Sequence, residues 1–153
     1  EYKGFDFLAF FQGSVGNDIL NILKYDIYSG TGWYNAPKDI LTTFWNGQGS
    51  TNKNFAIDAN SRMNLEMSEW YIEDGSYMRL KNVQIGYTLP ASFTKKLTIN
   101  NLRLFVAAQN LFTVTGYSGL DPEIGNNSPQ YMGIDMGFYP QARTYMFGIS
   151  MKL

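Results

Sequence analysis

The sequence contains four stretches in which apolar and polar residues alternate with a period of two, the pattern of a β-strand with one apolar face. Residues 144–153 show it most clearly, because every second side chain is large and apolar while most of the others are small or polar. The apolar members are Tyr145, Phe147, Ile149, Met151 and Leu153. A strand ending on such a face is expected in a closed barrel within a bilayer, where the outer face meets lipid.

Three further strands are predicted at about 2–12, 77–88 and 101–110. Their apolar faces comprise Phe5, Phe7, Ala9 and Phe11 in the first, Val83, Ile85 and Tyr87 in the second, and Leu102, Leu104, Val106 and Ala108 in the third. Arg79 and Lys81 fall on the face of Val83 by simple alternation, and we expect that end outside the hydrocarbon, where a charge costs roughly 2–4 kcal/mol. A soluble sandwich strand with one buried face shows the same alternation, so the strands alone leave both architectures open.

The connections between these strands are long, short and long. Residues 13–76 are rich in Gly, Asn, Ser and Thr, with one helical candidate at 17–23. Residues 111–142 are rich in Gly, Pro and Asn and have no clear period. The short link at 89–100 contains Pro90 and one possible helical turn at 92–96. Compact soluble domains seldom have such long connections. Antiparallel barrels of the outer membrane place long loops on the outside and short turns inside, which is the order seen here.

Composition supports a membrane wall and excludes several function classes. Aromatic residues make up 16% of the 153-residue chain and charged residues also 16%, against roughly 25% charged in soluble domains. A net charge of -1 without any basic run predicts no nucleic-acid partner. The absence of His and Cys removes Ser-His triads, Cys nucleophiles and the usual zinc sets. We therefore predict no enzymatic activity, no cofactor and no metal site.

Several longer motifs carry a family resemblance. They are Gly4-Phe-Asp-Phe with Phe10-Phe-Gln-Gly13, the run Tyr71-Ile-Glu-Asp-Gly-Ser-Tyr-Met-Arg-Leu-Lys-Asn-Val-Gln-Ile-Gly-Tyr-Thr-Leu-Pro90, Gln109-Asn-Leu-Phe112, Tyr117-Ser-Gly-Leu-Asp-Pro-Glu123, Gly133-Ile-Asp and Tyr139-Pro-Gln-Ala-Arg-Thr144. With these motifs in this order, the chain resembles the C-terminal end of SusC/RagA-like TonB-dependent transporters of the Bacteroidetes outer membrane. The resemblance covers nearly the whole chain.

The resemblance implies an all-β fold and an import function. Such transporters are barrels of about 22 strands with a plugged lumen, so residues 1–153 would supply the last four antiparallel strands and two long extracellular loops. The plug and the TonB-contacting segment would lie outside this sequence, which we expect to be a fragment. The family imports oligosaccharides or peptides across the bacterial outer membrane. Its partners are a SusD-like surface lipoprotein, TonB, and the barrel-assembly machinery during insertion.

Two sets of site residues follow from this resemblance. Tyr145, Phe147, Ile149, Met151 and Leu153 resemble the signal that the barrel-assembly machinery reads, although that signal typically ends in Phe rather than Leu. The same residues are also explained by packing against lipid. In the first long connection, Trp33, Tyr34, Phe44 and Trp45 are candidates for stacking on sugar rings. Packing of the loop against its neighbours or against the lid protein is the explanation that we favour, because a loop of this length needs such anchors.

Two acidic sets have a structural explanation that we favour. Asp121, Glu123 and Asp135 offer oxygen ligands for a hard cation, but their spacing matches no calcium loop and Pro122 indicates a turn. Pairs of carboxylates such as Glu69 and Glu73 are formally able to hydrolyse a glycoside, but acidic residues in a polar loop are usually solvated.

Two other functions remain as alternatives. A soluble carbohydrate-binding β-sandwich would pack the apolar faces of the four strands against each other rather than against lipid. A siderophore-type TonB-dependent receptor is disfavoured by the specific runs quoted above.

Overall fold

The computed structural model describes residues 1–29, 34–57, 66–94, 99–124 and 129–152. The chain divides into two compact units. We call residues 1–15, 77–115 and 140–153 the sheet unit, and residues 16–76 and 116–139 the loop unit. Each unit is therefore assembled from segments that are far apart in the sequence.

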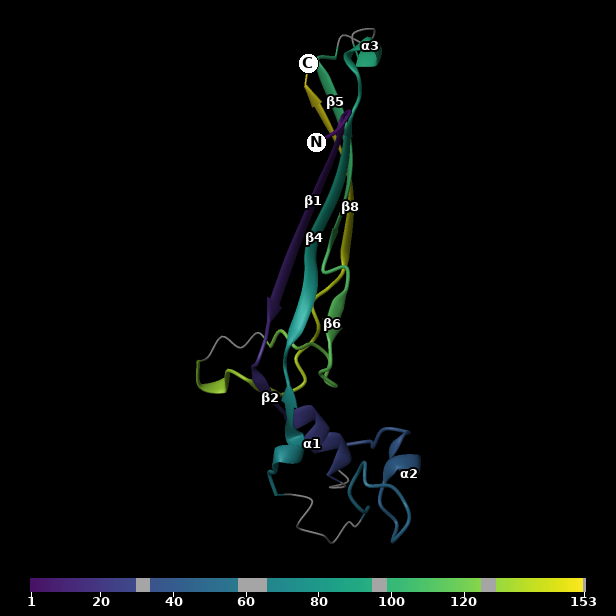
Figure 1. The fold of residues 1–153 in the computed structure, drawn as a ribbon, viewed down its shortest axis with the longest axis vertical. Helices are drawn as coiled ribbons and strands as arrows, with labels where there is room; N and C mark the ends of the chain where they lie inside the picture. Colours follow the sequence, from purple (N-terminus) through teal and green to yellow (C-terminus); the bar gives the residue numbers. More distant parts are fainter. Residues whose placement is uncertain (30–33, 58–65, 95–98, 125–128, 153) are drawn as a thin grey trace. The chain divides into compact units, whose positions relative to one another are not determined.

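The sheet unit is built on four long antiparallel strands in the order β1-β4-β5-β8 (Figure 1). They are β1 (Phe5–Ser14), β4 (Tyr77–Thr88), β5 (Asn101–Gln109) and β8 (Thr144–Lys152), with a short β6 (Thr113–Thr115) also paired to β4 and a helical turn, α3 (Ala91–Thr94), between β4 and β5. The predicted antiparallel strands are confirmed, since neighbours along the chain pair directly. The predicted turn at 92–96 lies partly outside the described residues, and α3 accounts for its start.

One face of this sheet is apolar from edge to edge. The pairing aligns Phe7 with Ile85, Val106 and Phe147 in a single row across the four strands. Paired residues point to the same side of a sheet, so apolar residues of all four strands share one face. Phe7 is 69% exposed and Phe147 is 81% exposed. In the described part of the sheet unit these side chains stay exposed, which counts against a β-sandwich, where they would be buried.

The opposite face is more polar and carries fewer large side chains. One row joins Phe10, Asn82, Gln109 and Thr144, and the next joins Leu8, Gln84, Ala107 and Met146. A wall with lipid on one side and a hydrated interior on the other requires this division.

The predicted face of Arg79 is wrong, because β4 contains a bulge. The register shifts between Phe10 and Phe11, so that Lys81 is an extra residue on β4 and Arg79 pairs with Gln12. A bulge inserts one residue and changes the alternation beyond it. Arg79 thus leaves the face of Val83; it is 3% exposed and its Nε donates to Thr113 Oγ1 at 2.7 Å.

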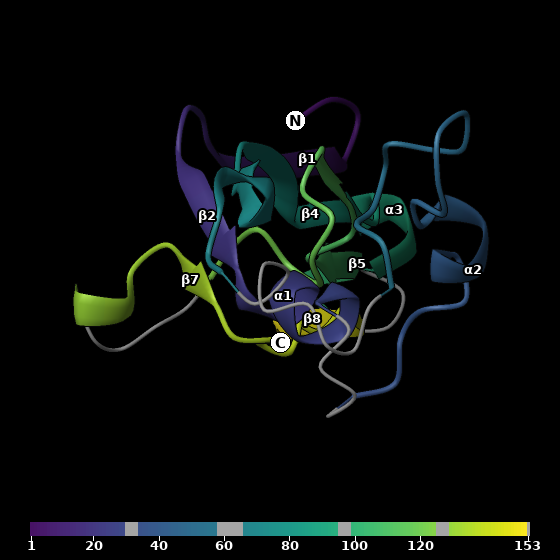
Figure 2. The ribbon, with the colours of Figure 1, turned by 90° about the horizontal axis from the view of Figure 1, so that it is seen from below.

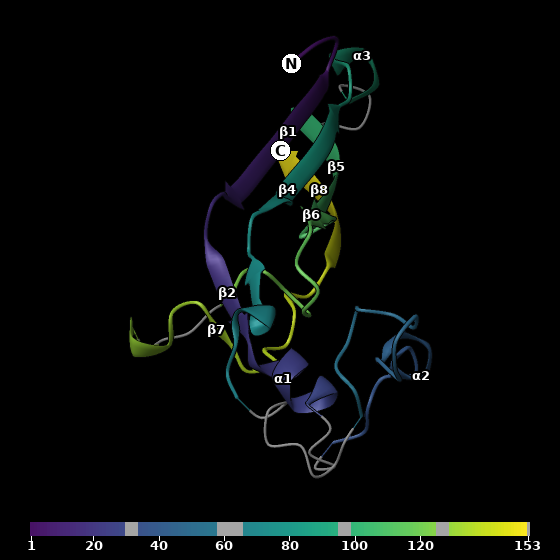
Figure 3. The ribbon, with the colours of Figure 1, turned by 60° about the horizontal axis from the view of Figure 1, so that its bottom comes forward.

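The loop unit contains a second, three-stranded sheet in the order β3-β2-β7. Its strands are β2 (Asp18–Asn21), β3 (Ile72–Asp74) and β7 (Ile134–Asp135), accompanied by the helices α1 (Ile22–Tyr28) and α2 (Ile40–Thr43) and the 3-10 turns η2 (Glu69–Tyr71) and η4 (Pro129–Tyr131). β2 is the central strand: it pairs antiparallel with β3 on one side and parallel with β7 on the other. Figure 2 and Figure 3 show β2 and β7 side by side. The small sheet thus pairs two strands from the first long connection with one strand from the second.

The predicted helix at 17–23 is wrong in both position and type. Ile19 is 1% exposed and lies in the central strand of the small sheet, so residues 18–21 are extended. The helix begins only at Ile22, because the side chain of Asn21 accepts a hydrogen bond from Lys24 N at 2.8 Å and caps it. The expectation of nearly unstructured loops was too simple for the same reason, since tertiary pairing orders segments that have weak local preferences.

An aromatic cluster forms the core of the loop unit. Tyr71 is fully buried and lies 5.2 Å from Tyr25 and 5.0 Å from Trp70, measured between ring centroids. Phe55 approaches Trp70 at 4.7 Å. These rings tie α1, η2 and the segment after α2 together, and rings at such separations and tilts attract one another.

Candidate functional site

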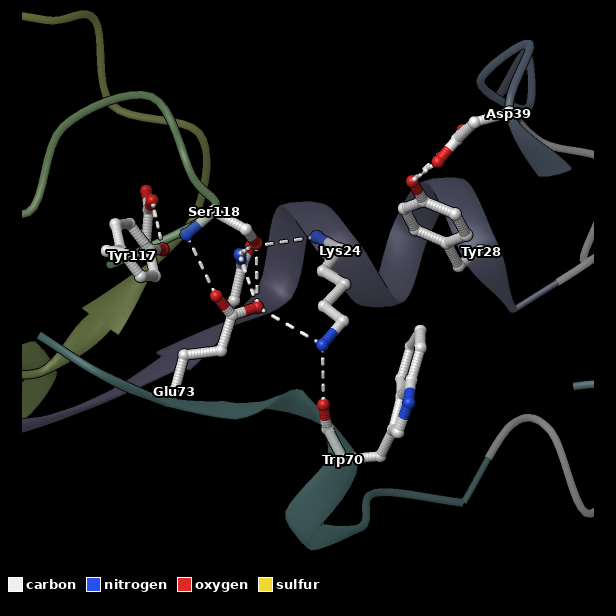
Figure 4. Close-up of polar contacts among 9 residues, drawn as sticks. Lys24, Tyr28, Asp39, Trp70, Glu73, Tyr117 and Ser118 are labelled. Atoms are coloured by element: carbon white, nitrogen blue, oxygen red, sulfur yellow. Dashed lines mark hydrogen bonds and ion pairs between the residues drawn. The ribbon is translucent and has the colours of Figure 1, made fainter. Parts of the chain in front are cut away.

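The carboxylate of Glu73 on β3 joins three segments of the loop unit (Figure 4). Ser118 donates its backbone N–H to Oε2 at 2.9 Å and its hydroxyl to Oε1 at 2.8 Å. The Lys24 ammonium lies 3.2 Å from Oε1, and Asn21 Nδ2 donates to the same oxygen at 3.3 Å. Glu73 therefore connects β3, the β2-α1 junction and the second long connection.

The surroundings of Glu73 favour its charged form. Burial by itself raises the pKa of this carboxyl, but the hydrogen bonds from Ser118 and the contact with Lys24 outweigh it, and the pKa lies below its ordinary value. The Glu73 and Lys24 side chains are only 15% and 19% exposed. Their interaction is therefore screened less than that of a surface pair.

Lys24 is held in place from three sides. Its ammonium donates to the backbone oxygen of Trp70 at 2.8 Å and lies 3.9 Å from the centroid of the indole ring, in addition to its contact with Glu73. A cation over an aromatic face is attracted by the ring electrons. The indole is surrounded by Lys24 and by the rings of Phe55, Tyr28 and Tyr71.

One turn further along α1, Tyr28 donates its hydroxyl to Asp39. The oxygen separations are 3.0 Å to Oδ2 and 3.2 Å to Oδ1. Burial and the neighbouring carboxylate both raise the pKa of Tyr28, so the hydroxyl keeps its proton and acts as a donor. Figure 4 shows the Asp39 carboxylate directed at this hydroxyl.

These groups surround a hollow of about 340 Å³ within the loop unit. Its lining includes Lys24, Tyr28, Asp39, Lys53, Trp70 and Glu73. A smaller hollow of about 130 Å³ shares Lys24, Tyr28 and Ser118 with it. The hollow offers hydrogen-bond donors, hydrogen-bond acceptors and charged groups of both signs, which suits the binding of a polar ligand.

The acids once considered as cation ligands have structural roles. Tyr117 donates its hydroxyl to Asp135 Oδ2 at 2.6 Å, and the other oxygen of Asp135 accepts from the backbone of Gly137. Burial, followed by the bond to Asp135, raises the pKa of Tyr117 well above its ordinary value. Asp121 accepts from the N–H of Glu123 at 2.9 Å, as in an Asx turn. No group of three potential metal-ligating side chains occurs among the residues that the structure describes.

A second polar cluster lies on the sheet unit, on the face opposite the apolar rows. Arg103 on β5 donates Nε to Asp6 Oδ2 on β1 at 2.8 Å and Nη2 to Oδ1 at 2.5 Å. The strand between them, β4, presents Gly86 at this level. A Cβ at Gly86 would collide with both Asp6 and Arg103. In the same row, the Phe105 ring covers Gly148.

Among the aromatic residues predicted to contact sugar, the described Tyr34, Phe44 and Trp45 do not line the hollow. Tyr34 is 63% exposed and Trp45 is 45% exposed, while Phe44 pairs through its backbone with Asn54. Trp33 lies outside the described residues. A sugar-binding role for these residues therefore stays a prediction without a shared site.

The predicted barrel-assembly residues lie on the apolar face of β8, where the alternation placed them. Tyr145, Phe147, Ile149 and Met151 are each more than half exposed, and Leu153 lies outside the described residues. Recognition by the assembly machinery stays a prediction.

The sequence analysis missed the site around Lys24 and Trp70. Glu73 was considered only as a partner of Glu69, which is exposed on η2, whereas the Glu73 carboxylate binds Ser118 and Lys24. No local pattern connects Lys24 with a residue so distant in the sequence. Trp70-Tyr71 directly before a strand was the one local sign of a buried aromatic cluster.

The helices in the described part of the chain are all too short or too polar to cross a bilayer.

Comparison with known proteins places these features in a family, although the sequence matches no family model. TonB-dependent receptor P3 of Formosa agariphila is 40% identical over 157 residues, covering 99% of this chain and 15% of that protein. TonB-dependent receptor SusC of Bacteroides thetaiotaomicron is 27% identical over 162 residues, covering 99% of this chain and 14% of SusC.

Solved structures give the same result. The RagAB peptide importer in its open-open state matches with a TM-score of 0.79 at 27% identity, over 98% of this chain and 16% of that one. The RagAB peptide transporter matches with a TM-score of 0.78 at 30% identity, over 99% of this chain and 16% of that one. The chain thus spans about one sixth of these proteins, and its all-β, mostly antiparallel fold corresponds to a fragment of such a transporter. The chain belongs to the SusC/RagA-like TonB-dependent receptors, as a segment of one.

Proposed function

We propose that this chain is the C-terminal part of a TonB-dependent importer in the bacterial outer membrane. The observation that carries the proposal is the 40% identity to a TonB-dependent receptor over nearly the whole chain. In this proposal β1, β4, β5 and β8 are the last four strands of a barrel of about 22 strands, and the loop unit is built from its two long extracellular loops.

The two faces of the sheet support this placement. Exposed apolar rows such as Phe7, Ile85, Val106 and Phe147 suit contact with lipid hydrocarbon. The polar face, with the Asp6–Arg103 pair, suits a hydrated lumen. The chain's contribution is to form wall and outer vestibule, so that substrate captured outside passes through the lumen; no catalytic step is assigned to it.

The cargo is an oligosaccharide or a peptide, and the similarity to the RagAB peptide importer favours a peptide. A SusD-like surface lipoprotein is the proposed lid. TonB would act through a segment outside this sequence, and the barrel-assembly machinery would insert the protein.

Uptake by intact cells tests this proposal. Cells expressing the full-length receptor and its lid should accumulate labelled peptides or oligosaccharides, and deletion of either the receptor or TonB should abolish that accumulation. The purified receptor should run at different positions on a gel with and without heating, as closed barrels do. Accumulation that persists without TonB, or a receptor that is soluble without detergent, would overturn the proposal and favour the β-sandwich.

A further inference from the structure

The hollow between α1, the α2 segment and β3 contains one ion pair and two charged groups for which the described residues supply no oppositely charged partner. Lys24 and Glu73 neutralise each other within it. Among the described residues, the Asp39 carboxylate accepts a hydrogen bond only from the neutral hydroxyl of Tyr28. The Lys53 ammonium, which also lines the hollow, has no ion-pair or hydrogen-bond partner in the described part of the chain. Within the described part of the chain, one negative and one positive group are thus available to a ligand.

We propose that this hollow binds the charged termini of a short peptide, with Asp39 facing the peptide ammonium and Lys53 facing its carboxylate. The inference rests on the proposed import function and specifies its substrate class. A hydrogen bond between two charged groups is stronger than one between neutral groups. A zwitterionic ligand therefore forms stronger hydrogen bonds with Asp39 and Lys53 than an uncharged sugar does.

The surroundings of Trp70 argue against a glycan in this hollow. Sugar binding commonly requires an aromatic side chain with a free face, against which the apolar face of the sugar ring packs. The indole of Trp70 instead has the Lys24 ammonium 3.9 Å from its centroid and is contacted by Phe55 and Tyr28. Its role is to support Lys24.

The hollow has a suitable size and a fixed floor. Its volume of about 340 Å³, with a further 130 Å³ adjoining, lies at the lower end of small-molecule sites and suits a peptide of a few residues. Lys24 is fixed by Trp70 and by Glu73, which Ser118 fixes in turn. A floor that is ordered before binding loses little entropy when the ligand arrives.

Retention of short casein peptides by the purified receptor tests the proposal. The full-length receptor with its lid is incubated in detergent with a hydrolysate of short casein peptides, and the retained peptides are quantified by mass spectrometry. The same hydrolysate, acetylated and amidated at its termini, serves as the ligand control. The variants are Asp39→Asn and Lys53→Gln, and Lys38→Gln removes a neighbouring exposed lysine that is not part of the lining.

We expect Asp39→Asn and Lys53→Gln each to lower the retention of free peptides about tenfold. Lys38→Gln should retain as much as the parent protein, and blocked peptides should bind weakly to every version. Equal retention by Lys53→Gln and parent protein would overturn the proposal, as would equal retention of free and blocked peptides or no retention at all. Lys53→Gln alone suffices for this decision, because the only other contact of Lys53 with a described residue, from its backbone N–H to Thr51, is kept in the variant.

Failure of this site and failure of the importer function give different results. If TonB-dependent uptake of casein peptides is unchanged in Asp39→Asn and Lys53→Gln cells, the site is wrong and the import function stands. If receptor-dependent uptake of any peptide or sugar proceeds without TonB, the import function itself is wrong.

Discussion

Arg103 on β5 forms a two-bond ion pair with Asp6 on β1, across the intervening strand β4. The contact is possible because β4 presents Gly86 at the crossing, where any side chain would occupy the space of the pair. Paired forks of this type fix geometry as well as charge. The pair therefore fixes the register of three strands on the polar face of the sheet.

Replacing Gly86 by alanine should weaken the wall. The added Cβ would collide with Asp6 and Arg103, and an extra methyl group in a filled site costs about 1–3 kcal/mol. The temperature at which the folded full-length receptor loses its heat-dependent gel position should fall. Gly116→Ala is the control, because a Cβ there would meet no atom within 4 Å. Equal effects of the two substitutions would show that the space above Gly86 is not needed.

Glu73→Gln should loosen the loop unit without affecting the sheet unit. The substitution removes the ion pair with Lys24 and weakens the two bonds from Ser118. A charge-assisted hydrogen bond contributes about 1.5–3 kcal/mol, so backbone amides at 116–119 should exchange with solvent at least tenfold faster. Glu69→Gln, a change at an exposed position, is the control. Unchanged exchange at 116–119 in Glu73→Gln would mean that Glu73 does not hold this segment.

Acid should produce the same loosening in the parent receptor. The pKa of Glu73 in the folded protein lies below its ordinary value of 4.5. The carboxylate therefore stabilises the fold fully above about pH 4.5, and this contribution disappears as the pH falls through the lowered pKa. Hydrogen exchange of the backbone amides at 116–119, corrected for the pH dependence of the intrinsic exchange rates, should accelerate below about pH 4.5.

The Glu73→Gln variant separates this titration from others in the same range. The pKa of Asp74 is also lowered, by hydrogen bonds from Ser76, and contributes acid sensitivity of its own. Any acid response that persists in Glu73→Gln belongs to Asp74 or to other acids. An identical response in parent and variant would contradict the assignment to Glu73.

Tyr117→Phe should destabilise the junction of β7 with the rest of the loop unit. The hydroxyl donates to Asp135, which is 1% exposed, and its removal takes one donor from a buried carboxylate. Such a loss costs about 1–3 kcal/mol and should appear as faster exchange at 134–138. Tyr131→Phe changes a half-exposed tyrosine of η4 and should have little effect. Equal exchange in the two variants would show that the bond is energetically unimportant.

The sequence was informative where the structure depends on local alternation. The period of two located the four long strands to within three residues at each end and assigned the apolar face correctly along β1, β5 and β8. It failed at Arg79, because a bulge one residue long is invisible in the alternation and changes every face beyond it.

Long-range contacts in the loop unit were beyond the reach of the sequence. Ile19 lies in a strand only because β3 and β7 pair on either side of β2. Likewise, Glu73 holds the loop unit together through its contacts with Lys24 and Ser118, and no spacing in the sequence indicates these contacts. These contacts are made by tertiary folding, which overrides weak local propensity.

Neighbouring residues on β8 provide the sharpest test of the two faces of the wall. Phe147 pairs with Val106 on the apolar face, and Met146 pairs with Ala107 on the polar face. An arginine on the lipid side costs roughly 2–4 kcal/mol near the bilayer centre, whereas the lumen side tolerates it. Phe147→Arg should therefore greatly reduce the amount of folded full-length receptor in outer membranes, and Met146→Arg should leave it nearly unchanged.

Because Phe147 also belongs to the predicted barrel-assembly signal, the purified variants should be refolded into lipid vesicles without the assembly machinery. A defect of Phe147→Arg in vesicles as well as in cells indicates lipid contact, and a defect in cells alone indicates the assembly signal. Equal amounts of the two variants in both settings would show that the assigned faces are wrong.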